Sequence, residues 1–153
     1  MAAQGNIMKI KRAKHDALIS MLQRCSTDYT CDWCGKYYDP EKGLSKGIHA
    51  SHYWGRGIRQ LRWWHENLTT ACYGCHIRAA SDPWKHTQMM ISRLGLQRMQ
   101  ELETMAYSKY KLTAKDKNAA LDHLAEQWRV MSIKRREGVR GPLPYQGWLP
   151  CFQ

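Results

Sequence analysis

Residues 31–34, Cys-Asp-Trp-Cys, and residues 72–75, Cys-Tyr-Gly-Cys, decide how this chain folds. Each pair of cysteines can present two thiolates from a tight turn to one tetrahedral ion, and four sulfurs complete the coordination shell of a structural zinc. The 37 residues between the pairs contain few core candidates, so the metal would supply a large share of the local folding free energy. We therefore expect one structural Zn²⁺ ion, bound by Cys31, Cys34, Cys72 and Cys75.

Two other chemistries share parts of this cysteine pattern. Residues 72–76 also spell C-x-x-C-H, the pattern of haem attachment, but that chemistry requires export and leaves the first pair unexplained. A thioredoxin-like redox site needs one pair on a βαβ scaffold, and the sequence shows no such scaffold. Cys25 and Cys151 fit neither pair, and we expect both to be plain thiols.

The charge of the chain favours a polyanionic partner. Lysine and arginine outnumber acidic residues 24 to 13 among 153 residues, which gives a formal net charge of +11. A solvated basic surface or an anionic membrane are the alternatives, but no apolar or amphipathic segment of membrane length is present, so we favour nucleic acid. The first ten residues lack the apolar stretch of a secretory signal, so we expect a reducing cytoplasmic location, where paired cysteines bind metal.

Helical periodicity flanks a central region of different character. We predict a helix over residues 11–24, and a loop-rich hairpin between the cysteine pairs with short segments at 47–53 and 58–64. A helix begins near Cys72. Further helices are predicted over residues 83–94, 96–107 and, after a capping box at Thr113 and Asp116, up to Gly138.

These elements predict an α+β fold that is mostly helical. We expect a single domain over residues 1–153, with a zinc-bound core at 26–82, a helical extension at 83–137 and an extended tail at 138–153. Seven tryptophans and eight tyrosines stand against one phenylalanine, and such amphipathic rings suit surfaces that are partly wet.

Three polar residues inside and after the hairpin suggest hydrolytic chemistry. Phosphodiester hydrolysis needs a general base for water and a cation that neutralises charge on the leaving oxygen. His52 suits the base, since the pKa of a histidine lies close to working pH. Asn67 could hold that imidazole or its backbone, or simply cap the next helix, and His76 could reach a divalent ion from that helix or be a plain surface residue.

The order His, Asn, C-x-x-C-His resembles the HNH nucleases, which have a ββα-metal fold. The resemblance implies that His52 is the general base, Asn67 a positioning residue and His76 a ligand of a catalytic Mg²⁺ or Mn²⁺ ion. Many HNH enzymes carry an aspartate or histidine directly before the base, where this chain has Ser51. His49, three residues before His52, is the candidate substitute.

A closer resemblance is to the NinG/Rap family of lambdoid phage recombination nucleases. It rests on Ser-His-Tyr at 51–53, Gln-Leu-Arg-Trp at 60–63, Asn67 with the second cysteine pair, and looser agreement over the helices up to residue 136. His76 stands where those proteins often carry asparagine. The resemblance implies an endonuclease that cuts branched DNA, including Holliday junctions, in the cytoplasm of a phage-infected bacterium.

Basic and aromatic residues are the candidate DNA contacts. Arginine forks pair with phosphates, and aromatic rings can stack on unpaired bases. We expect one of Trp63 and Trp64 to pack inside the hairpin, because neighbours on a strand face opposite ways. The predicted contacts are Arg56, Arg59, Arg62 and Trp54 in the hairpin, and Lys134, Arg135 and Arg136 at the end of the last helix.

The sequence therefore favours a metal-dependent, structure-selective DNA endonuclease, and we expect a homodimer because two symmetric incisions need two active sites. A non-catalytic zinc-ribbon protein that binds nucleic acid is the main alternative, and it predicts that His52 is dispensable. An HNH nickase or restriction-type nuclease is the other.

Overall fold

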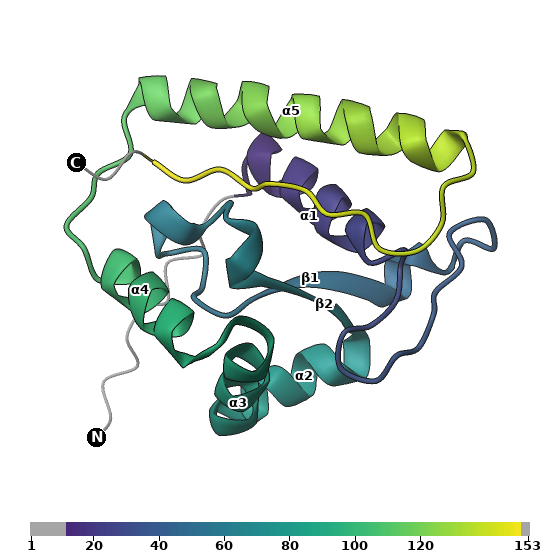
Figure 1. Ribbon diagram of the computed structural model, residues 1–153, viewed down its shortest axis with the longest axis horizontal. Coiled ribbons are helices and arrows are strands. Elements are labelled where there is room, and N and C mark those ends of the chain that lie inside the picture. Colours follow the sequence, from purple (N-terminus) through teal and green to yellow (C-terminus); the bar gives the residue numbers. More distant parts are fainter. Residues whose placement is uncertain (1–11, 151–153) are drawn as a thin grey trace.

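A computed structural model describes residues 12–150 and places a two-stranded sheet at the centre of a mostly helical protein (Figure 1). Strands β1 (Ile48–His52) and β2 (Leu68–Cys72) pair antiparallel, with His52 opposite Leu68 and Ile48 opposite Cys72. Helix α1 (Lys14–Ser26) covers one face of this sheet and α2 (Tyr73–Ser81) the other. The expected α+β architecture is confirmed.

Helix α1 is amphipathic, and its apolar side faces the sheet. Ile19, Leu22 and Cys25 are buried there at the spacing of one helical face. The helix begins at Lys14, later than predicted, because Asp16 in its first turn accepts a hydrogen bond from the Ala13 amide at 2.7 Å. The predicted start at residue 11 lies outside the described residues.

The second half of the hairpin differs from the prediction. Residues 58–64 do not form a strand; 3₁₀ turns occupy Arg59–Leu61 and His65–Asn67, and the second strand is Leu68–Cys72. Every residue of β2 is buried, because helices cover both faces of the sheet, so the strand shows no polar alternation. Trp63 and Trp64 are both buried, in separate clusters, so the expectation that only one of them packs is wrong.

The later helices follow the predicted boundaries closely. Helices α3 (Pro83–Leu94) and α4 (Leu96–Ala106) meet at Gly95, whose φ of 83° favours glycine. Helix α5 (Ala114–Arg136) begins with the expected capping box between Thr113 and Asp116. It packs on α1, so α1 lies between α5 and the sheet (Figure 1). None of the helices within residues 12–150 combines the length and apolar character needed to cross a membrane.

Residues 139–150, after α5, form neither helix nor strand and are attached to the core by hydrogen bonds; the end of the predicted tail, 151–153, lies outside the described residues. The Leu143 amide donates to the Ser26 carbonyl at 2.8 Å, and the Trp148 amide donates to the Trp63 carbonyl at 2.9 Å. The Gly147 amide donates to Nδ1 of His65 at 3.0 Å. Residues 139–150 therefore tie α1 to the segment between the strands.

Candidate functional site

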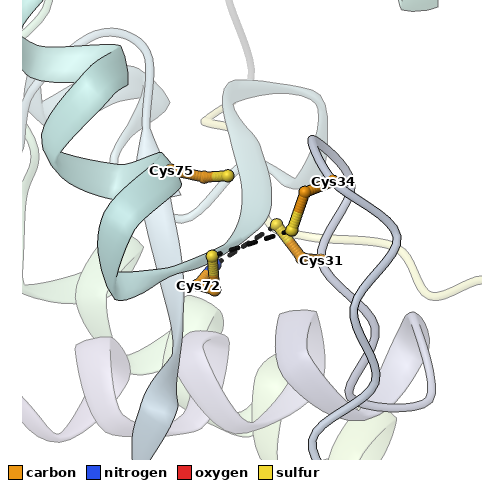
Figure 2. A group of neighbouring side chains, drawn as sticks. All are labelled: Cys31, Cys34, Cys72 and Cys75. Carbon is orange, nitrogen blue, oxygen red and sulfur yellow. Dashed lines mark hydrogen bonds between the residues drawn. The ribbon is translucent and has the colours of Figure 1, made fainter.

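The four paired cysteines converge on one point (Figure 2). Their sulfur atoms all lie within 4.8 Å of one another, and Sγ of Cys34 is 3.8 Å from Sγ of Cys72. Tetrahedral zinc with Zn–S bonds of about 2.3 Å places its sulfurs about 3.8 Å apart, so the cluster has the size of a zinc site. In residues 12–150 this is the one group of three or more possible metal ligands.

Two different local structures bring the pairs together. Cys31 and Cys34 flank a turn in which the Gly35 amide donates to the Cys31 carbonyl at 2.9 Å. Cys72 ends β2, and Cys75 lies in the first turn of α2. Asp32 joins the two parts, because its amide donates to the Thr70 carbonyl at 2.8 Å and its carboxylate accepts from the Thr70 amide at 2.6 Å.

The thiols of this cluster have shifted acidities. Burial raises the pKa of the Cys72 thiol, but hydrogen bonds with the Cys75 amide and the neighbouring thiols outweigh burial and lower that pKa to about 6. Burial and the Cys72 sulfur raise the pKa of Cys75 to about 12. Without a metal, the cluster therefore favours a single thiolate, on Cys72. Four thiolates at these distances repel one another, so all four can be deprotonated together only around a cation. Cys25 lies apart in the α1 core, and Cys151 lies outside the described residues.

His52 is held in one orientation at the end of β1. Its Nε2 lies 2.9 Å from the carbonyl oxygen of Arg62, which can only accept a hydrogen bond. Nε2 therefore carries the hydrogen, and Nδ1 keeps the lone pair that a general base needs. Burial lowers the pKa of His52 and outweighs the opposing effect of the Arg62 carbonyl, so the imidazole is neutral near pH 7.

Asn67 fixes the loop that follows His52. Its side chain is fully buried, accepts from the Trp54 amide at 2.7 Å and donates to the carbonyls of Trp54 and Leu61 at 2.9 and 3.0 Å. Its own carbonyl accepts from the Tyr53 amide at 2.9 Å. Asn67 thus holds the backbone beside His52 and has no hydrogen bond to the imidazole among the described residues.

His76 and His49 lie side by side across α2 and β1. Their ring centroids are 5.8 Å apart. His49 is thus the β1 residue next to His76, whereas Ser51 is buried in the strand. Two imidazoles can supply part of the shell of a divalent ion, with water and phosphate oxygens as the remaining ligands.

All three histidines line one open groove of about 600 Å³, which we call the basic groove. Its walls also carry four cationic residues, Arg12, Arg24, Lys46 and Arg56. Among the described residues that line it, Asp16 is the one acid, and it is already paired with Arg62. Of these cations, the sequence prediction named only Arg56. Arg12 and Arg24 are distant from the hairpin in the sequence, and Lys46 lies in the turn before β1, so only the net charge indicated them.

Two predicted DNA contacts have structural roles. The Arg62 guanidinium is 11% exposed and pairs with Asp16 at 2.5 Å. Arg135, also 11% exposed, donates at 2.6 Å to the carbonyls of Cys25 and Gly141 and lies 3.9 Å from Asp28. Both guanidinium groups hold elements of the fold together.

The other predicted DNA contacts differ in exposure. Arg56, Arg59, Lys134 and Arg136 are exposed, and of these Arg56 lines the basic groove. Trp54 is half-buried against the cluster around Leu61 and Leu102.

Comparisons with protein families, with curated proteins and with solved structures find no match for this chain.

Proposed function

We propose that this protein is a metal-dependent DNA endonuclease of the HNH type that acts on branched DNA. The observation that carries the proposal is that His52, whose Nε2 is occupied by the Arg62 carbonyl, lines a groove together with the His49–His76 pair and four cationic residues. The chain order β1, β2, α2, with a cysteine cluster joining the hairpin to the helix, supports the likeness to ββα-metal nucleases.

Each part of the groove has a separate task in this proposal. Cationic side chains bind the phosphate backbone without reading its sequence. His52 takes the proton of a water molecule as its oxygen attacks phosphorus, and the bond to the leaving oxygen breaks. A Mg²⁺ or Mn²⁺ ion, held by His76 and His49, would neutralise charge on the phosphate. A zinc ion bound by the four cysteines would fix the end of α2 that presents His76.

Branched DNA such as a Holliday junction is the proposed substrate, in phage recombination in a bacterial cytoplasm, as in the NinG/Rap family that the sequence resembles. Two opposed incisions would require two copies of the site, so we propose a homodimer. Sedimentation of the zinc-loaded protein, alone and with a junction, tests this assembly.

The deciding experiment compares cleavage of a labelled four-way junction and a matched linear duplex by wild type, His52→Ala and His123→Ala. His123 is the control, because it lies on α5 outside the basic groove. With Mg²⁺ or Mn²⁺ we expect His52→Ala to bind the junction but to cut it at least about 100-fold more slowly, the usual worth of a general base. Equal behaviour of all three proteins, with binding and no cleavage, would leave a zinc-ribbon protein that only binds nucleic acid.

A further inference from the structure

A second groove of about 530 Å³ adjoins the catalytic residues and differs in chemistry from the basic groove. His52 and His76 line both. The second groove runs between α2 and the start of α3, and none of the described residues that line it is Lys, Arg, Asp or Glu. We call it the aromatic pocket, after the rings of Tyr53, Trp54, His86 and Tyr107.

The rings of the aromatic pocket are fixed by contacts with one another. The Tyr53 ring meets Trp54 edge-on with centroids 4.6 Å apart, and meets His86 edge-on at 4.9 Å. The Tyr53 hydroxyl lies 2.7 Å from the Thr87 hydroxyl. On the α2 side the lining residues are His76, Ala79 and Ala80, and the two alanines have small side chains that leave the space open. An open space lined by aromatic rings suits a planar ligand.

His86 adds an unused hydrogen-bonding atom to this region. It is 7% exposed, and its Nε2 has no partner within residues 12–150. Burial lowers the pKa of His86, with the charges of Arg93 and His76 adding to the effect, so the ring is neutral near pH 7. An unpaired polar atom inside a protein costs free energy, and a ligand or a water that pairs with it recovers that cost.

We propose that the aromatic pocket receives one unpaired nucleobase next to the scissile phosphate. This inference rests on the endonuclease function proposed above, and it adds that the site selects DNA with an unpaired base. The two grooves share His52 and His76 as lining residues, so a phosphate bound at these histidines would have cations on one side and uncharged rings on the other. A nucleotide has the matching division into an anionic backbone and a planar, uncharged base.

Selection for branched DNA follows from the cost of filling the pocket. A base inside a duplex must unpair and unstack to enter, whereas a base at a junction, flap or single strand is already free. Stacking on aromatic rings accepts any base, because every base has a π-face. The pocket would thus favour unpaired positions without selecting a sequence.

The test measures 2-aminopurine fluorescence when zinc-loaded protein, without Mg²⁺ or Mn²⁺, binds a short single strand containing that base or the matched duplex. Ala80→Trp fills the pocket, and Tyr107→Ala removes an exposed ring from its wall. Tyr73→Ala is the matched control, since Tyr73 is 66% exposed, against 71% for Tyr107, and lies outside the pocket. We expect both pocket variants to lose quenching and to bind the single strand about 10-fold more weakly, with duplex binding unchanged.

Equal quenching and affinity in wild type and Ala80→Trp would overturn the pocket, whatever the protein cuts. Failure of the endonuclease proposal is a separate result. In that case wild type does not cut DNA with Mg²⁺ or Mn²⁺, while its DNA binding and 2-aminopurine quenching can still be measured. Circular dichroism and zinc content confirm that each variant is folded, so a loss of quenching is assigned to the pocket itself.

Discussion

The imidazole of His52 is oriented by the backbone of Arg62, whose carbonyl oxygen lies 2.9 Å from Nε2. That carbonyl is fixed in turn by its own side chain, because the Arg62 guanidinium donates from Nε to the Asp16 carboxylate at 2.9 Å. The Trp63 indole donates to the same carboxylate at 3.0 Å. Helix α1 thus sets the orientation of the proposed base through the Asp16 carboxylate.

The pH dependence of cleavage follows from this arrangement. Burial places the pKa of His52 below 6.5, and only the neutral imidazole can accept a proton. We expect single-turnover rates to be constant near neutrality and to fall as the pH drops below about 6.5, through the pKa of His52. Zinc content measured at each pH is the control. A fall in rate that begins above pH 7 would contradict the assignment.

Arg62→Ala should reduce stability more than DNA binding. Its loss leaves the Asp16 carboxylate, 4% exposed, without its cationic partner, and breaking a buried pair costs about 3 kcal/mol of unfolding free energy. Urea unfolding of the zinc-loaded protein measures this. Hydrogen bonds from Arg62, Ala13 and Trp63 outweigh burial and lower the pKa of Asp16. The ion pair therefore stabilises the fold above about pH 4, and this stabilisation is lost as the pH falls further and Asp16 is protonated.

Arg56→Ala is expected to show the opposite pattern. Arg56 is exposed in the basic groove, so its removal should change the unfolding free energy by less than about 0.5 kcal/mol. DNA affinity should fall, and the dependence of log affinity on log salt should flatten by about one unit, the signature of one lost phosphate contact. An unchanged salt dependence would remove Arg56 from the interface.

The parts that could be predicted from the sequence depend on neighbours along the chain. The spacing within each cysteine pair keeps two thiols close together, and the capping residues Thr113 and Asp116 set the start of α5, so the structure confirms the four-cysteine cluster and this helix start. The sequence does not locate strand β2, because burial on both faces removes the alternation that marks a strand. Five residues without alternation, Leu-Thr-Thr-Ala-Cys, fit a strand or a helix equally well.

The roles of the arginines depend on partners far away in the sequence. Arg62 meets Asp16 across 46 residues, and Arg135 meets the Cys25 carbonyl across 110. Nothing in the local sequence distinguishes such an arginine from one that binds phosphate. The same holds for Arg24 and Lys46, which reach the basic groove from α1 and the turn before β1.

Asn67→Ala should both destabilise the protein and slow cleavage. The substitution removes three hydrogen bonds of a fully buried side chain and leaves the Trp54 amide and carbonyl without their Asn67 partner, while the Leu61 carbonyl keeps the Trp64 amide. A loss of about 3 kcal/mol of unfolding free energy is expected. Cleavage at a temperature where the variant is fully folded should still be reduced, because the loop beside His52 is released. Wild-type rates there would limit Asn67 to a purely structural role.

Zinc binding distinguishes the cluster cysteines from Cys25. We expect one zinc per chain by native mass spectrometry, and loss of that zinc in Cys31→Ser, because three thiolates leave the tetrahedral shell incomplete. Cys25→Ala is the matched control, since both thiols are 2% exposed and only Cys31 belongs to the cluster. A strong chelator should lower the melting temperature of wild type, because the metal joins the turn at Cys31 to the start of α2. Full zinc content in Cys31→Ser would contradict the site.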